Sequence, residues 1–401
     1  MTQADPMATS QDDAEEKLLI RVEGAMADIA PEAWDACANP STRPYNPFLS
    51  HAFLNALETS ESVSGRAGWL PRHLVLEEAG QVTGCMACYV KSHSQGEYVF
   101  DYGWADAYER AGGRYYPKLQ VSVPFTPATG RRLLVEDGPD QEYREKALMS
   151  GAVELCRKAG TSSVHWTFLT EGEYHRLGTL GLLQRMDQQF HWLNDGYDSF
   201  DDFLAALSSR KRKNVKKERA GALCNGIEVE WLTGSDLTEA HWDAFYTFYM
   251  DTGSRKWGRP YLTRSFFSHV SEAMADDILL VIARREGRII AGALNFIGGD
   301  TLYGRNWGCV EDHRFLHFEL CYYQAIEFAI ERGLKRVEAG AQGPHKLARG
   351  YVPVTTYSAH YIADPGLDQA VREYLTRERQ YVEAEQQHLA RHVPFKKHSE
   401  Q

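Results

Sequence analysis

The densest group of side chains able to carry acid–base chemistry lies in one glycine-rich stretch, EAGAQGPHKLARGY (338–351). Glu338, His345 and Tyr351 are of the types that pass protons in enzymes when their surroundings tune them. The glycines between them let a ligand approach the backbone closely, and backbone N–H groups there suit an oxyanion or a phosphate. The alternative is an ordinary loop between two strands.

The same stretch carries groups suited to an anionic ligand. Gln342, Lys346 and Arg349 all offer N–H donors, and those of Lys and Arg form charge-assisted hydrogen bonds with phosphate or carboxylate. The whole stretch is therefore the leading candidate for a catalytic or ligand-binding site.

A run of positive charge forms a second candidate. The segment SSRKRKNVKKER (208–219) holds seven Lys or Arg residues in the ten positions from Arg210 to Arg219. Its first four cations, Arg210, Lys211, Arg212 and Lys213, suit the phosphates of a nucleotide, a carrier or a tRNA. The alternative is a solvated helix face, although like charges on adjacent helical turns repel one another.

Arg305 and Trp307 form a third candidate, in the motif RNWG (305–308) at the expected end of a central strand. The neighbours of Arg305 have the character of buried residues, and a buried charge needs a partner or an anionic ligand. The alternative is a structural arginine paired with a carboxylate such as Glu319 or Glu338.

An aromatic and basic stretch, RAGGRYYPK (110–118), is the fourth candidate. Tyr115, Tyr116 and Lys118 lie in it and are expected to line a substrate pocket. The alternative is scattered surface polarity.

Several classes of site have no support in the sequence. There is no Walker loop, no GxSxG elbow and no HExxH motif, so hydrolase, kinase and dehydrogenase functions are not indicated. His317 and Cys321 have a metal-like spacing, and Cys85 and Cys88 form a lone CxxC. Neither has a second pair nearby, so no metal site is predicted.

The elements that must position these residues occur twice. HLVLEEAGQVTG near residue 73 matches LLVIARREGRIIAG near residue 279, and each is later followed by an amphipathic helix, a glycine and a strand. The first copy is 34 positions longer between its hairpin glycine and its helix-ending glycine. The repeat predicts two copies of one α/β unit, with a cleft between or within them.

Length and repeat together predict the domain organisation. We expect a disordered tail at 1–16, α/β domains at 17–195 and 196–365, and a C-terminal helix and tail at 366–401. Each domain is expected to be a mixed central sheet flanked by helices.

The composition limits the classes of ligand and the cell compartment expected for the protein. The 401 residues carry a formal net charge of −11, which argues against a general DNA binder but not against a local basic groove. Seven scattered cysteines fit a reducing compartment. Because no signal peptide and no membrane-spanning apolar run are present, a soluble cytoplasmic protein is predicted, as a monomer or homodimer.

Five segments together resemble one known family: SSRKRKNVKKER, IARREGRIIAGALNF, GRNWG, LHFELCYYQAIEFAI and EAGAQGPHKLARGY. They resemble the FemAB-like proteins of the GNAT acyltransferase superfamily, in the bacterial branch described as peptidoglycan biosynthesis/recognition. The resemblance runs from about residue 20 to 365 and implies tandem GNAT-like domains. Two family features are absent: the long helical hairpin of tRNA-dependent members and the usual GNAT pyrophosphate loop.

The resemblance implies an enzyme that moves an acyl or aminoacyl group to an amine on a cell-wall precursor or small metabolite. The donor would be aminoacyl-tRNA or acyl-CoA as a co-substrate, with no tightly bound cofactor. In that reading Glu338 or His345 is the base, Tyr351 the acid, and Arg305 with Lys346 or Arg349 the anion holder. The alternative is a non-catalytic module that recognises a peptidoglycan precursor or peptide.

Overall fold

The structure is a computed structural model that describes residues 18–256, 260–340, 343–391 and 394–396. The tail predicted at 1–16 lies outside the described residues. In the first half the strands are β1 (Leu19–Glu23), β2 (Trp69–Pro71), β3 (His73–Glu78), β4 (Gln81–Met86), β5 (Cys88–Lys91), β6 (Lys118–Val121), β7 (Leu134–Val135), β8 (Ser163–Leu169) and β9 (Leu183–Leu193). Its helices are α1 (Pro31–Ala38), α2 (His51–Thr59), α3 (Tyr102–Arg110), α4 (Gln141–Ala159) and α5 (Glu171–Thr179).

The second half repeats this layout. Its strands are β10 (Ile227–Leu232), β11 (Ile278–Arg285), β12 (Arg288–Ile297), β13 (Thr301–Cys309), β14 (Arg336–Glu338) and β15 (Val352–Ile362). Its helices are α6 (Phe200–Ala206), α7 (Ser209–Ala222), α8 (Glu239–Lys256), α9 (Arg264–Met274), α10 (Leu316–Phe318), α11 (Gln324–Glu331) and α12 (Pro365–Ala390). A short 3₁₀ helix, η6, spans Pro344–Arg349.

The predicted repeat is visible in the hairpins. The β3–β4 turn at Ala79-Gly80 and the β11–β12 turn at Glu286-Gly287 both have two consecutive residues with positive φ. Two such residues define the turn that matches the natural twist of a two-stranded hairpin. The first-copy helix α4 ends at Gly160 with φ 63°, as its sequence predicts.

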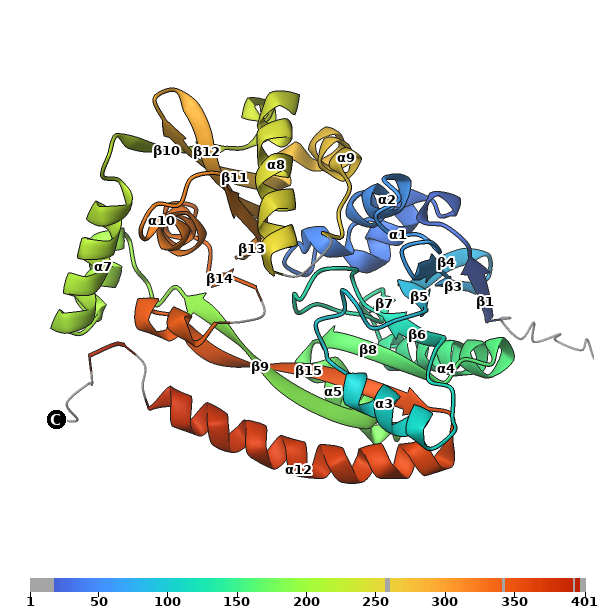
Figure 1. Cartoon of the computed structure of the whole chain (residues 1–401). Coiled ribbons are helices and arrows are strands. Elements are labelled where there is room, and N and C mark those ends of the chain that lie inside the picture. Colours follow the sequence, from blue (N-terminus) through green and yellow to red (C-terminus); the bar gives the residue numbers. More distant parts are fainter. Residues whose placement is uncertain (1–17, 257–259, 341–342, 392–393, 397–401) are drawn as a thin grey trace, which may run out of the picture.

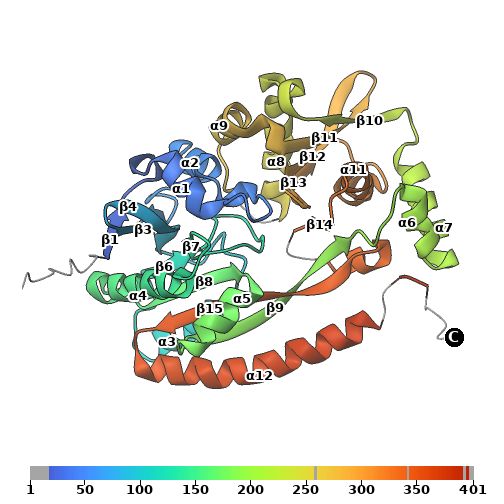
Figure 2. The same cartoon turned by 180° about the vertical axis from the view of Figure 1, so that it is seen from behind.

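Strand pairing joins the two halves into one sheet. The eleven-stranded sheet has the order β10-β11-β12-β13-β14-β9-β15-β8-β6-β5-β2, beside a four-stranded sheet β1-β3-β4-β7. β15, the last strand of the chain, therefore lies between β9 and β8 of the first half, and β14 pairs with β9. Figures 1 and 2 show β9 and β15 running side by side between the halves, with α12 along them.

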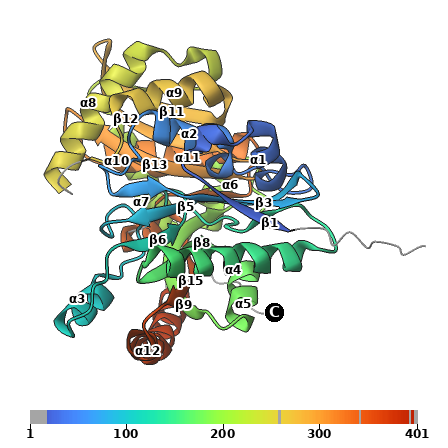
Figure 3. The same ribbon diagram turned by 90° about the vertical axis from the view of Figure 1, so that its right-hand side faces the viewer.

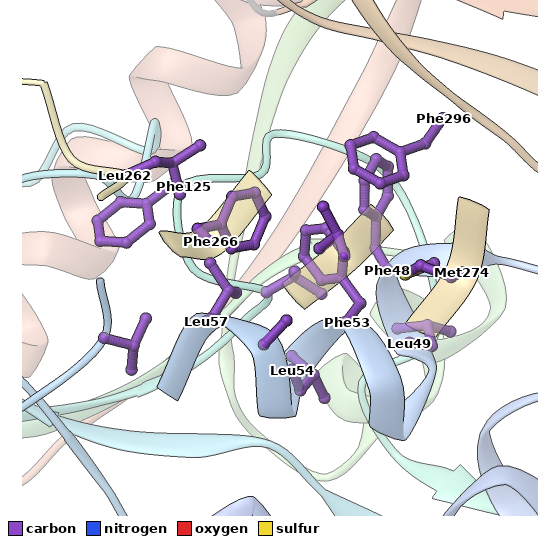
Figure 4. Packing of buried hydrophobic residues seen from close by; sticks show 14 of the residues in the cluster. Phe48, Leu49, Phe53, Leu54, Leu57, Phe125, Leu262, Phe266, Met274 and Phe296 are labelled. Carbon is purple, nitrogen blue, oxygen red and sulfur yellow. The ribbon is translucent and has the colours of Figure 1, made fainter. Parts of the chain in front are cut away.

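The halves also share a hydrophobic core. Helices lie above and below the sheets, with α8 and α9 at one end and α12 at the other in Figure 3. Helix α2 of the first half packs on α9, where the rings of Phe53 and Phe266 are 5.8 Å apart, and Phe53 also contacts Phe296 of β12 (Figure 4). This contact makes the arrangement of the halves a packed interface rather than a loose hinge.

The long helix predicted at 316–333 contains a π-helical turn at Glu319–Tyr323, between α10 and α11. The turn coincides with Glu319, whose side chain is fully buried and bound by Arg219 of α7. Such turns inside α-helices often mark functional sites. In the described part of the chain, no helix is long and apolar enough to cross a membrane.

Candidate functional site

Strand β13 pairs with β14 only at its beginning. The two strands pair in parallel over Thr301–Tyr303 and Arg336–Glu338, after which β13 continues to Cys309 paired with β12 but not with β14. A bulge sits at the point of separation, because Asn295 of β12 faces Gly304 while Leu294 faces Asn306. Arg305 is the extra residue of this bulge.

The bulge turns the side chains of β13 to opposite faces of the sheet. Before it, the Tyr303 ring contacts Phe48 of the first half at 5.0 Å. After it, the Trp307 ring packs against His317 at 5.2 Å, on the face covered by α10 and α11. A one-residue change of register reverses the face on which side chains lie. The space left where β13 and β14 separate, here called the gap, therefore lies between the face that meets the first half and the face covered by α10 and α11.

On the helix-covered face lies a pocket of about 90 Å³. Gly304, Arg305, Trp307, Cys321 and Tyr322 are among its lining residues. A Cβ atom at Gly304 would lie 3.3 Å from Asn295 Oδ1 and 3.4 Å from the Glu338 carbonyl oxygen, so the glycine keeps the gap open. Of these two neighbours, Asn295 belongs to β12 and Glu338 to β14.

On the opposite face lies Glu338, at the end of β14. Its carboxylate is buried, and Oε2 accepts no hydrogen bond from the described residues. Burial raises the pKa of Glu338 to about 7, and Arg336, Arg305 and a hydrogen bond from the Thr129 backbone oppose this shift. A carboxyl group with a pKa near neutrality can exchange a proton at physiological pH.

Arg305 lies at the gap between the two faces. Its guanidinium donates to the backbone oxygen of Phe125 in the first half and lies 5.6 Å from the centre of the Phe48 ring. A structural arginine at this position was expected to pair with Glu319 or Glu338. Neither carboxylate forms an ion pair with Arg305 within the described residues. Arg305 is thus a half-buried cation held mainly by a carbonyl oxygen and the Phe48 ring.

The loop after β14 is tied back to the strand by Lys346. Its ammonium donates to the backbone oxygens of Ala339 and Gly340, the latter at 2.8 Å. Burial lowers the pKa of Lys346 to about 8. This lysine therefore fixes the backbone immediately beyond Glu338.

His345 and Tyr351 lie on the helix-covered side of the gap, away from the Glu338 carboxylate. His345 Nε2 is 2.9 Å from the Tyr322 hydroxyl, which belongs to the pocket wall. Tyr351 is fully buried beside the Tyr322 ring, and its hydroxyl has no hydrogen-bond partner among the described residues. Burial keeps its pKa well above the usual value, so it stays protonated. Gln342 lies outside the described residues.

Arg349 is bound within the chain. It forms two hydrogen bonds to Glu218 of α7, at 3.0 and 2.9 Å, and its guanidinium lies 3.4 Å from the centre of the Phe318 ring. Because its guanidinium is both paired with Glu218 and stacked on Phe318, Arg349 connects η6 to α7. Its predicted role in holding an anion stays a prediction.

The basic helix α7 contacts α10, the π-turn and η6 (Figure 1). Arg210 and Lys213 are exposed, and Lys211 and Arg212 are half-buried. None of these four forms an ion pair within the described parts of the chain. The helix thus presents Arg210 and Lys213 to solvent, while Glu218 and Arg219 fix it to η6 and the π-turn.

The predicted pocket at Tyr115, Tyr116 and Lys118 is instead a packed network. Lys118 is fully buried and donates to Ser94 at 2.9 Å, to Glu97 at 2.6 Å and to Asp101. The Tyr115 hydroxyl donates to Asp101 at 2.7 Å, and that of Tyr116 is 2.8 Å from Ser94. These groups bind one another because buried charges need partners, and their role in substrate binding stays a prediction.

The equivalent gap in the first half is filled. β6 and β8 are its parallel pair, joined over Leu119–Val121 and Val164–Trp166. Beyond that point Arg132 donates to the carbonyl oxygens of Thr167, Arg131 and Ala128 at 2.8, 3.0 and 2.9 Å. Arg132 comes from the insertion that the sequence comparison of the two copies identified, so the open gap lies in the second half.

Sequence reasoning missed two residues near Glu338. His191 and Gln189 lie on β9 of the first half, and β9 reaches Glu338 only because the halves share one sheet. No local pattern marks such a contact. Among the described residues, no group of three His, Cys, Asp or Glu side chains is placed to hold a metal.

Comparison with known proteins identifies the family and the fold. The family model described as peptidoglycan biosynthesis/recognition, FemAB-like, matches residues 25–397. A crystal structure of FemX is 15% identical, with 86% of this chain and 98% of FemX covered at a TM-score of 0.54.

One further solved structure shares the fold, and a second is similar at a lower score. The C-terminal domain of a protein named as a lysylphosphatidylglycerol synthetase, from Agrobacterium fabrum, is 10% identical, with 85% of this chain and 95% of that domain covered at a TM-score of 0.51. A tandem GNAT protein from the clavulanic acid biosynthesis pathway is 13% identical, with 87% and 99% covered at 0.46. No curated protein matches the sequence. The fold is that of tandem GNAT domains.

Proposed function

This chain belongs to the FemAB-like family, and we propose that it transfers an acyl or aminoacyl group to an amine at the gap between β13 and β14. The acceptor we propose is a peptidoglycan precursor, in keeping with the family description. One observation carries the proposal. Ala339 lines the pocket on the face covered by α10 and α11, and the preceding residue, Glu338, has its buried carboxylate on the face that meets the first half.

Acyl transfer needs a donor and an acceptor brought together from different directions. In this proposal the acyl end of the donor enters through the pocket beside Gly304 and Tyr322. The acceptor amine approaches from the first half, beside Glu338. The reacting carbonyl carbon then lies in the gap itself.

The residues at the gap match the proton and charge movements of this reaction. Glu338 takes a proton from the acceptor amine, which makes its nitrogen nucleophilic. Arg305 stabilises the negative charge that develops on the carbonyl oxygen. Tyr322, hydrogen-bonded to His345, is placed to protonate the leaving group, a role that the sequence had suggested for the more deeply buried Tyr351.

The donor is expected to carry phosphate groups that the cations of α7 contact. Aminoacyl-tRNA and acyl-CoA both meet this requirement. The exposed Lys and Arg side chains of α7 favour a long polyanion as the donor, because they are spread along a helix of 14 residues.

A transfer assay tests the proposal directly. The purified full chain is incubated with labelled aminoacyl-tRNA in one reaction and labelled acetyl-CoA in another, each with an extract of bacterial cell-wall precursors. We expect label to move into an amine of a precursor, and Glu338→Gln to abolish the movement. Label that stays on both donors, with the protein shown to be folded, would favour a module that only recognises the precursor.

A further inference from the structure

Two hydrogen-bond acceptors from different halves face each other beside the gap. β9 and β14 are antiparallel, and their register places His191 directly opposite Glu338. His191 Nδ1 and Glu338 Oε1 are 3.9 Å apart, which is beyond hydrogen-bonding distance. The two side chains are only 4% and 7% exposed.

The hydrogen-bond network fixes which nitrogen of His191 carries the proton. Gln189 Nε2 donates to the backbone oxygen of Pro127 at 2.8 Å, so its Oε1 is free to accept. That oxygen lies 3.2 Å from His191 Nε2. Because a neutral imidazole has one N–H, the proton is on Nε2 and the lone pair of Nδ1 points to Glu338.

The neutral form of His191 is the relevant one. Burial, together with the nearby cations Arg336 and Lys346, lowers the pKa of His191 to about 3. At neutral pH a lone pair therefore faces a carboxylate oxygen, and Glu338 Oε2 also accepts no hydrogen bond from the described residues. Buried acceptors are normally paired with donors, so His191 Nδ1 and Glu338 Oε2 together suit a group with several N–H bonds.

We infer that Glu338 and His191 form the binding site for the primary amine of the acceptor, with one hydrogen bond to each half of the protein. This inference rests on the proposed acyl transfer for its role in catalysis, but not for its binding chemistry. A primary ammonium group has three N–H bonds, enough for both residues. A quaternary ammonium has none and is excluded.

The charges around the pair favour a neutral, nucleophilic amine once it is bound. Arg305, Arg336 and Arg132 face Glu338, and Asp300 partly offsets them. These cations disfavour a further positive charge on the bound ammonium, and burial raises the pKa of Glu338 to about 7, so the ammonium passes one proton to Glu338. The nitrogen then attacks the acyl carbon, the bond from that carbon to the leaving group breaks, and the second proton goes to the leaving group.

Nitrogen NMR on the full chain tests the site without any acyl donor. The protein is labelled with ¹⁵N-histidine, and the His191 signals are assigned from their loss in His191→Gln. Methylammonium chloride is the probe. We expect it to shift the Nδ1 signal of His191, because that nitrogen begins to accept a hydrogen bond.

The controls are a second ammonium salt, a second pair of buried histidines and a variant of Glu338. Tetramethylammonium chloride, which has no N–H, is expected to leave the signal unmoved at equal ionic strength. The buried pair His165 and His360, whose Nδ1 atoms are 2.7 Å apart, is expected to stay constant with either salt. Glu338→Gln preserves the side-chain shape and is expected to weaken methylammonium binding about tenfold, since a hydrogen bond to a charged acceptor is lost.

Three results would overturn the inference: no shift with methylammonium, an equal shift with tetramethylammonium, or unchanged binding in Glu338→Gln. Because no donor is present, such a failure is separate from a failure of the transfer assay. With an active donor and acceptor in hand, His191→Gln is expected to raise the acceptor KM about tenfold and leave the donor KM unchanged. Equal rises in both would point to a structural role for His191.

Discussion

Arg219 of α7 binds Glu319 through two nitrogens, with the shortest contact at 2.8 Å, and Glu319 is the first residue of the π-turn. The carboxylate is fully buried, whereas the guanidinium is 20% exposed. This pair connects the basic helix to the turn that places Cys321 and Tyr322 in the pocket wall. The cationic surface and the pocket are thus parts of one rigid assembly.

Arg219→Met is expected to lower the free energy of unfolding by about 3–5 kcal/mol, because it leaves the buried carboxylate of Glu319 without its cation. Urea unfolding measures the change. Lys216→Met on the same helix is the matched control. Lys216 is 61% exposed and 3.6 Å from Asp201, so its loss is expected to cost less than about 1 kcal/mol. Equal losses in the two variants would contradict the coupling.

Glu338→Gln is expected to reduce kcat by about 10²–10⁴-fold while the protein stays folded, because the general base is lost. In the wild-type protein, kcat/KM is expected to rise with pH through about 7, as the carboxyl group with its raised pKa loses its proton. The pH profile of the purified enzyme checks both statements. A variant that keeps the wild-type profile would assign the base elsewhere.

Gly304→Val is expected to block the gap, since a Cβ there already meets Asn295 and the backbone of Glu338 within 3.4 Å. Donor binding, measured as KM, is expected to weaken more than acceptor binding. Gly24→Val is the control, because a Cβ at Gly24 has no atom within 4 Å. If the control loses as much activity, the effect is one of stability alone.

Charge reversal on α7 distinguishes the two donor classes. Lys213→Glu with Lys217→Glu is expected to weaken tRNA binding strongly and to reduce its salt dependence, because each lost phosphate contact lowers the slope of log K against log salt by about 0.9 or less. Both lysines are exposed, so folding is expected to be unaffected. Lys146→Glu on α4, also exposed, is the control. An unchanged salt slope would remove α7 from donor binding.

His165 is expected to make the protein sensitive to acid. Burial lowers its pKa in the folded state to about 3, against about 6.5 in the unfolded chain. Above pH 6.5 the residue is neutral in both states. Below it, only the unfolded chain binds the proton, so stability falls by up to about 1.4 kcal/mol per pH unit until the pH approaches 3. Urea unfolding from pH 7 to 5 is expected to show a shallower loss in His165→Gln than in the wild type.

The sequence was sufficient for the repeat and for the local elements. The two hairpin turns, the helix ending at Gly160 and the strand carrying Arg305 and Trp307 follow from turn chemistry, capping and periodicity, which act over a few residues. The family followed from several motifs taken together. These features depend on short-range physics, so they can be read along the chain.

The partners of the candidate residues were harder to predict. For Arg305 the alternative to an anionic ligand was a structural ion pair with Glu319 or Glu338. In the structure Glu319 binds Arg219, and Arg305 donates to a carbonyl oxygen of the first half. Lys118 was expected in an open pocket and is instead buried by Glu97 and Asp101. Charge pairing depends on which surfaces meet, and residue type alone does not specify this.

By itself, the sequence determined that the chain repeats one α/β unit and that its acid–base residues gather after the second long helix. Only the tertiary structure decided that the gap is open in the second half, where Gly304 leaves space, and filled in the first, where Arg132 occupies it. It also decided that His191 faces Glu338. These outcomes depend on long-range strand pairing, since β9 and β14 are brought together by a sheet that the whole chain must complete.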